Sequence, residues 1–179
     1  MKRKVIVWIL LVTVLPIGAM ADKTGFGIVA GGLYPVAQED QEAGKTVGAK
    51  FRFRLTGPLV LEPNANFGSF GDVTIDGVGS RDGSTMNHYG LDVLVGGLPA
   101  AIGPKPFAFI GGGVYTIKRE GATTVNKSGW SFGAGLAVGV MKILDIEVRG
   151  RFNIASFDGS TSKKSVAVTG GLIYYFGKE

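Results

Sequence analysis

The chain has 179 residues, of which 19 are Lys or Arg and 14 are Asp or Glu, so its formal net charge is +5. Three of the 19 basic residues lie among the first four positions, which leaves 16 against 14, and this small excess gives no reason to expect nucleic-acid binding. Cysteine is absent, which excludes disulfides and thiolate metal sites.

Residues 1–21 are predicted to be a cleaved signal peptide. Lys2, Arg3 and Lys4 supply the positive start, Val5–Gly18 is apolar, and Ala19-Met20-Ala21 matches a small-residue cleavage site. The alternative is a transmembrane helix, but the apolar run is short for the roughly 20 residues that a span needs. One domain, residues 22–179, is expected to follow, and with no helix-length apolar run it could span a membrane only with strands.

Eight strands are predicted in this domain, separated by turn-rich segments. They are Thr24–Tyr34, Thr46–Leu55, Leu59–Phe67, Met86–Gly96, Pro106–Lys118, Gly129–Val140, Leu144–Ile154 and Ser165–Phe176. Long polar connections (36–45, 69–85, 119–128 and 156–164) alternate with shorter ones, which is typical of an outer-membrane barrel. Pro63 removes a donor and should weaken or bulge the third strand.

The segment Leu144–Ile154 alternates most strictly, with apolar residues or Gly at one position and polar, mostly charged residues at the next. Such a strand has one apolar and one charged face, which suits a barrel wall between lipid and lumen. A secreted, lipocalin-like barrel with the faces reversed has the same alternation and remains an alternative. The 30 glycines suit a tightly curved wall whose inward side chains are crowded.

Under the membrane interpretation, charged residues point into the lumen and aromatic residues form belts at both membrane surfaces. The predicted lumen charges are Lys50, Arg52, Arg54, Glu62, Asp92, Asp145, Glu147, Arg149 and Arg151. The predicted aromatic girdle is Phe26, Tyr34, Phe53, Phe67, Tyr89, Phe107, Tyr115, Trp130, Phe152, Tyr174 and Phe176. The near balance of charge favours a plug of ion pairs over a selective pore, because about eight strands leave a lumen that side chains fill.

The eighth strand ends in Thr169-Gly170-Gly171-Leu172-Ile173-Tyr174-Tyr175-Phe176. This pattern resembles the assembly signal of the small outer-membrane β-barrel family of the OmpA, OmpX and opacity-porin type, at Thr169, Gly171, Tyr174 and Phe176. The resemblance implies an eight-stranded antiparallel transmembrane β-barrel, located in the outer membrane and recognised by the barrel assembly machinery. Many members end at the terminal Phe, whereas Gly177-Lys178-Glu179 follow here.

Three further patterns in the sequence contain residue types that could carry chemistry. His88 with Ser84 or Thr85 and Asp92 would be needed for a lipid-modifying enzyme, but no motif fixes them in a catalytic arrangement. Gly111-Gly112-Gly113 lacks the Lys and Ser/Thr of a phosphate loop. Asp72, Asp76 and Asp82 lack the spacing of an EF-hand.

The sequence therefore predicts a structural or surface-interaction protein without enzymatic activity, cofactor or metal. The expected partners are outer-membrane lipid and lipopolysaccharide, and any surface ligand would bind the long loops. A narrow channel, a lipocalin-like carrier and a lipid-modifying enzyme are the alternatives.

Overall fold

The computed structural model describes residues 24–36, 41–75, 79–81, 83–97, 101–118, 123–156 and 162–177. The predicted signal peptide lies outside the described residues. A search of the described ranges finds no helix with the length and apolar character needed to span a membrane.

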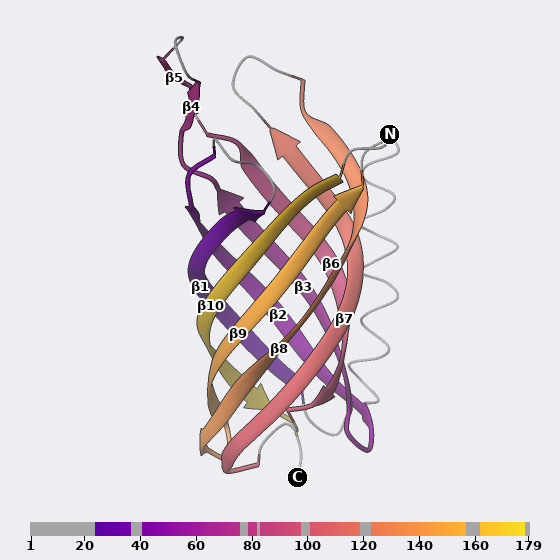
Figure 1. Cartoon of the computed structure of the whole chain (residues 1–179). Helices are drawn as coiled ribbons and strands as arrows, with labels where there is room; N and C mark the ends of the chain where they lie inside the picture. Colours follow the sequence, from indigo (N-terminus) through magenta and orange to yellow (C-terminus); the bar gives the residue numbers. More distant parts are fainter. Residues whose placement is uncertain are drawn as a thin grey trace.

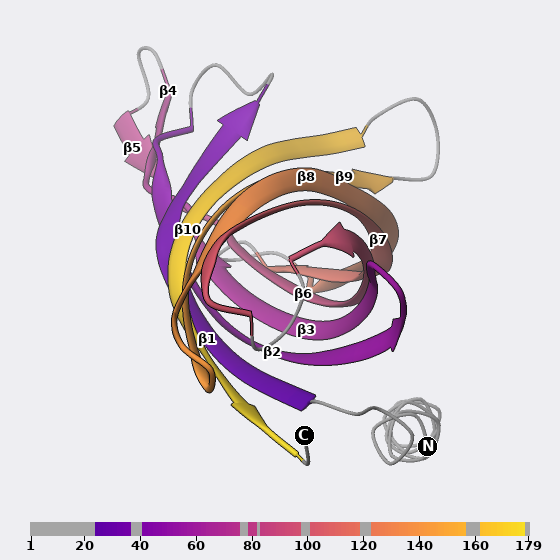
Figure 2. The ribbon, with the colours of Figure 1, turned by 90° about the horizontal axis from the view of Figure 1, so that it is seen from below.

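Eight long strands close into an antiparallel barrel (Figures 1 and 2), in the order β1-β10-β9-β8-β7-β6-β3-β2. Each strand pairs with the barrel strands before and after it, and β1 closes the ring against β10. The strands are β1 (Thr24–Val36), β2 (Gly44–Thr56), β3 (Leu59–Ser69), β6 (Thr85–Gly96), β7 (Gly103–Lys118), β8 (Val125–Met141), β9 (Leu144–Ser156) and β10 (Ser162–Phe176). The predicted fold class is confirmed.

The two ends of the barrel differ. At the turn end, β2 joins β3 through a turn at Gly57-Pro58 and β8 joins β9 through a turn at 142–143. At the loop end, a small ribbon of β4 (Val73–Ile75) and β5 (Gly79–Arg81) projects beyond the barrel (Figure 1). The sequence predicts a loop for this segment, because runs of three residues are too short to show a strand period.

The pairing of β2 with β3 is irregular near Pro63. Cα pairs run as far as Lys50 with Asn64 and resume at Phe53 with Leu61. A register shift follows between Arg54 and Thr56. The β2–β3 pairs of Pro63 and Glu62 are therefore missing, while the register is the same on both sides of this gap and the shift lies nearer the turn.

Apolar side chains cover the outside of the wall, and charged ones lie within. In β9, Val148 is 58% exposed and its neighbour Arg149 is 4% exposed. This orientation is the reverse of a lipocalin-like barrel. Large apolar residues are exposed on every strand of the barrel, for example Ile28, Val47, Phe67, Val93, Ile110, Leu136, Val148 and Leu172.

Glycines make room for large inward side chains on neighbouring strands. A Cβ at Gly135 would lie 2.4 Å from the Phe107 ring, and one at Gly133 would lie 2.8 Å from the Phe109 ring. Likewise, a Cβ at Gly25 would lie 2.7 Å from the Tyr175 ring. The abundance of glycine thus reflects crowding inside a narrow barrel.

Candidate functional site

The middle of the lumen holds seven buried ionised side chains, which we call the ionic centre. Its members are Lys50, Arg52, Glu62, Asp92, Glu147, Arg149 and Arg151. They come from β2, β3, β6 and β9, and the strict alternation of each strand turns them inward. All seven were predicted as lumen charges.

Glu62 and Glu147 each bind more than one cation. Arg52 Nε donates to Glu62 Oε2 at 2.5 Å, and the same guanidinium also pairs with Glu147. Arg149 Nη1 lies 2.6 Å from Glu62 Oε1, and Lys50 pairs with Glu147. Shared carboxylates of this kind compensate part of the cost of burying the charges.

Asp92 is the anion that pairs with the arginines nearer the loop end. Arg151 pairs with Asp92 and donates from Nη1 to Ser131 Oγ at 2.8 Å, while Arg149 Nη1 lies 3.4 Å from Asp92 Oδ2. The arginines also lie over inward aromatic rings. The guanidinium carbons of Arg149 and Arg151 are 4.5 and 4.9 Å from the Phe109 ring centre, within cation–π range.

A separate ion pair lies nearer the turn end. Lys105 Nζ donates to both oxygens of Asp145, at 2.6 and 2.5 Å, and the Tyr175 hydroxyl donates to Asp145 Oδ2 at 2.9 Å. Asp145 was predicted to face the lumen. Lys105 was missed because it lay in a segment assigned to a connection, although its even spacing from Phe107 and Phe109 was a usable signal.

Apolar clusters lie on both sides of the ionic centre. At the loop end they are Leu33, Phe70, Met86, Tyr115, Ile117, Ala155 and Ala167. At the turn end they are Val60, Leu94, Phe107, Phe109 and Ala137. The lumen is therefore filled by side chains along its length rather than lined as a channel.

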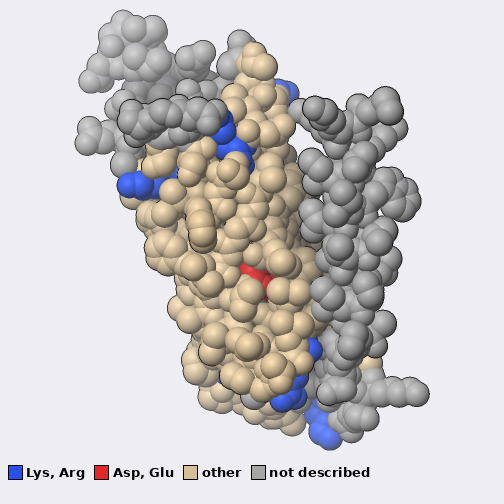
Figure 3. Space-filling model, turned by 90° about the vertical axis from the view of Figure 1, so that its right-hand side faces the viewer, with Lys and Arg blue, Asp and Glu red and all other residues tan. Residues whose placement is uncertain are grey.

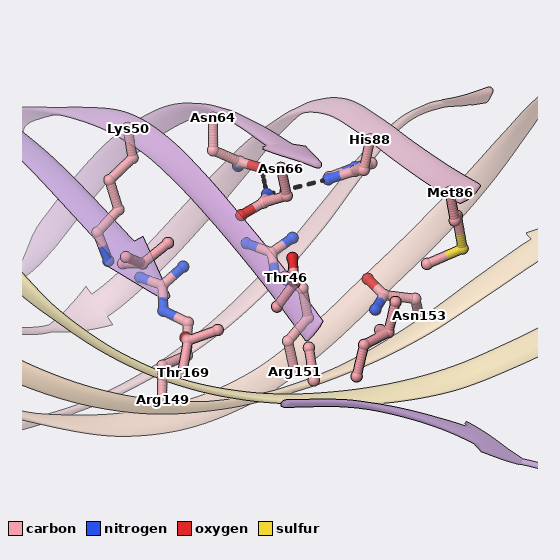
Figure 4. A pocket seen from close by; sticks show the side chains of 13 residues that line it. Thr46, Lys50, Asn64, Asn66, Met86, His88, Arg149, Arg151, Asn153 and Thr169 are labelled. Carbon is pink, nitrogen blue, oxygen red and sulfur yellow. Dashed lines mark hydrogen bonds between the residues drawn. The ribbon is translucent and has the colours of Figure 1, made fainter. Parts of the chain in front are cut away.

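A small cavity lies between the ionic centre and the loop-end cluster (Figure 4). The space in it that is open to the centre of a water-sized particle is about 30 Å³. Lys50, Arg149 and Arg151 reach it from β2 and β9, together with amides and hydroxyls of Asn64, Asn66, Asn153, Thr46 and Thr169. Val29, Leu33, Met86, His88 and Ala167 complete the lining.

Arg54 is a correction to the predicted lumen charges. It is exposed, whereas Arg52 is fully buried. Arg54 lies at the turn end of β2, next to the register shift between Arg54 and Thr56. Beyond the filled part of the lumen, the long side chain reaches solvent.

Phe107 and Tyr115 are corrections to the predicted girdle, because both are buried inside the barrel. Tyr115 stacks on His88 with ring centres 4.4 Å apart and donates to Asn153 Oδ1 at 3.2 Å. After Lys105, residues 106–114 of β7 are apolar or Gly on both faces, so alternation within this stretch could not decide its orientation. The inward orientation of β7 depends on glycines of β8. Gly129 leaves the space that the Tyr115 ring occupies, and Gly135 leaves the space for Phe107.

The other predicted girdle residues differ in exposure. Phe53 is buried and stacks on the exposed Phe51, with ring centres 6.4 Å apart. Phe152 is half-buried beside Phe132, at 5.3 Å. The remaining rings are exposed, namely Phe26, Tyr34, Phe67, Tyr89, Trp130, Tyr174 and Phe176.

The segment that resembles an assembly signal forms the closing strand β10. Thr169 is buried and lines the lumen cavity, and Gly171 is half-buried. Tyr174 and Phe176 are exposed on the outer face, where Phe176 pairs with Thr24 of β1. Gly177 follows the strand, and Lys178 and Glu179 lie outside the described residues.

The residues considered for catalysis do not converge. Ser84 accepts from Gln41 and Lys163, His88 lies beside Asn66 and Tyr115, and Asp92 binds arginines. Thr85 is exposed.

The other two patterns from the sequence are the glycine run and the three aspartates. Gly111-Gly112-Gly113 lies within β7. Asp72 is exposed, whereas Asp76 and Asp82 lie outside the described residues. Within the described ranges, no three His, Cys, Asp or Glu side chains are grouped as metal ligands.

The outer surface carries charge mainly near its two ends. Figure 3 shows basic side chains towards the top and bottom of one face and, between them, a broad band in which the visible charged atoms form one small acidic patch. At the loop end, Lys45, Lys118 and Lys164 are exposed, as are Glu42 and Asp72. A wall of this kind suits a bilayer core with polar layers on both sides.

Comparisons with known proteins show the fold only. No protein-family model matches the chain, and no curated sequence does. Neisserial surface protein A is similar in structure, with a TM-score of 0.67, 12% identity, and coverage of 87% of this chain and 98% of that one. The N-terminal β-barrel domain of Pseudomonas aeruginosa OprF is also similar, with a TM-score of 0.58 and 13% identity. This match covers 87% of this chain and 98% of that one.

Ail, the attachment invasion locus protein of Yersinia pestis, gives a TM-score of 0.53 at 12% identity, covering 87% of this chain and 99% of its own. These neighbours, the closed barrel and its apolar exterior agree with the resemblance noted in the sequence. The chain therefore has the fold of the small eight-stranded outer-membrane β-barrels.

Proposed function

We propose that this protein is a non-catalytic outer-membrane barrel whose role is structural or lies in surface interaction through its loop end. The observation that carries the proposal is the filled lumen, in which apolar clusters lie on both sides of the ionic centre. Such an interior provides rigidity and leaves the loops and the β4–β5 ribbon as the parts that can meet a partner.

The basic side chains at the loop end favour anionic partners. Lys45, Lys118 and Lys164 are exposed there, and ammonium groups attract phosphate and sulfate. The similar barrel Ail has been solved in complex with the heparin analogue sucrose octasulfate. We propose the phosphate groups of lipopolysaccharide as partners of these lysines, and the barrel assembly machinery as the partner of the β10 segment during biogenesis.

An epitope tag tests the orientation and the surface exposure together. A tag inserted between Ile75 and Gly79, in the connection of the β4–β5 ribbon, should bind antibody on intact cells. The same tag in the Gly57-Pro58 turn, at the opposite end of the barrel, should bind only after permeabilisation. Equal labelling of the two tags on intact cells, or release of the protein by osmotic shock, would refute the proposal.

A further inference from the structure

The charges of the ionic centre do not balance. Four cations, Lys50, Arg52, Arg149 and Arg151, face three anions, Glu62, Asp92 and Glu147. Lys105 and Asp145 pair with each other and add one charge of each sign, so they leave the excess of positive charge in the ionic centre unchanged. Within the ionic centre, positive charges therefore outnumber negative ones by one, which is costly in an interior of low dielectric constant.

The cavity lies where this excess is concentrated. Three of the four cations, Lys50, Arg149 and Arg151, contribute to its lining, and its lining residues include no Asp or Glu. Amides of Asn64, Asn66 and Asn153 and hydroxyls of Thr46 and Thr169 add neutral groups that can donate hydrogen bonds. The lining therefore suits an anion better than a cation.

Two residues that line the cavity each have a buried nitrogen without a hydrogen bond in the described part of the chain, Arg149 Nε and His88 Nε2. Arg149 Nε lies 3.2 Å from Glu147 Oε1, but it makes no hydrogen bond within the described part of the chain. Buried guanidinium groups normally satisfy their donors, so an unmatched one beside a cavity indicates an additional acceptor.

The volume limits the occupant. The centre of a water-sized particle can move through about 30 Å³ of this cavity, which leaves room for a small ion together with water. From the charge excess, the lining and the size, we propose that the cavity binds one small inorganic anion, such as chloride, between Lys50, Arg149 and Arg151. The bound ion would neutralise the ionic centre and stabilise the closed lumen.

Thermal unfolding of the detergent-folded full chain tests this site. Replacing gluconate by chloride or bromide at constant ionic strength should raise the unfolding midpoint by several degrees and should saturate. Gluconate is much larger than chloride or bromide and serves as the reference anion, and constant ionic strength holds surface screening fixed. Equal midpoints in the three salts would mean a cavity that holds water only, and would overturn the proposal.

Two variants of one strand locate the effect. Lys50→Met removes the surplus charge and should abolish the halide dependence. Lys45→Met makes the same change at an exposed position of β2 and should retain it. Crystals grown in bromide should show an anomalous peak between Lys50, Arg149 and Arg151. A halide effect that survives Lys50→Met, or bromide crystals without this peak, would refute the site even if a variant fails to fold.

Discussion

Glu62 is the residue through which most of the ionic centre is connected. Its two oxygens lie 2.5 Å from Arg52 Nε and 2.6 Å from Arg149 Nη1, and Lys50 Nζ is 3.9 Å away. Removing one partner of a buried ion pair leaves the other charge without compensation. Single residues of this kind therefore decide whether the lumen charges stabilise or destabilise the barrel.

We predict that Glu62→Gln lowers the free energy of unfolding by about 3–5 kcal/mol, because Arg52 and Arg149 lose a shared anion. Urea unfolding in lipid vesicles would measure the change. Glu42→Gln, which makes the same substitution at an exposed position, should have little effect. Similar values for the two variants would contradict the view that Glu62 organises the lumen.

Gly135 illustrates how a missing side chain fixes the position of another residue. A Cβ there would lie 2.4 Å from Phe107 Cζ and 2.6 Å from the carbonyl oxygen of Val148. We predict that Gly135→Ala destabilises the barrel by about 1–3 kcal/mol through overpacking. In Gly150→Ala, the added methyl lies 4.0 Å from the nearest atom, so the unfolding midpoint should stay close to that of the wild type. Equal midpoints for the two alanine variants would argue against Phe107 packing over Gly135.

At the scale of the element, β8 offers the sharpest test of which face meets lipid. Leu136 is 45% exposed and the next residue, Ala137, is fully buried. The chain contains no cysteine, so single thiols can be introduced without background labelling.

We expect Leu136→Cys to react with a lipid-soluble maleimide in folded, vesicle-embedded protein, because its side chain lies on the outer face. Ala137→Cys should react only after unfolding. Mass spectrometry of the intact protein would count the modified thiols. Preferential labelling at 137 would require the opposite orientation of the strand.

At the scale of the whole molecule, the filled interior predicts negligible ion flow. The ionic centre and both apolar clusters lie across the path from one end of the barrel to the other. Planar-bilayer recordings of the purified full chain should show no stable open state. A large and steady conductance would favour the porin-like alternative over a closed structural barrel.

Much of this architecture could be predicted from the sequence, because a two-residue period is a local property of the chain. The strict alternation in Leu144–Ile154 was sufficient to place Asp145, Glu147, Arg149 and Arg151 on one face of a strand. Turn residues such as Gly57-Pro58 marked the ends of strands, so all eight barrel strands were expected, with ends differing by at most a few residues.

The closed tertiary structure alone decided which face of an evenly apolar strand points inward and which charges pair across the lumen. Residues 106–114 of β7 are apolar or Gly on both faces, and the inward position of Phe107 and Tyr115 depends on glycines of β8 that are distant in sequence. Arg54 has the phase of a lumen residue but lies where the barrel ends. The partners of Glu62, Asp92 and Asp145 follow from the curvature that brings β2, β3, β6, β7 and β9 around one axis. Strand phase is set within each segment, whereas contacts across the lumen exist only once the wall has closed.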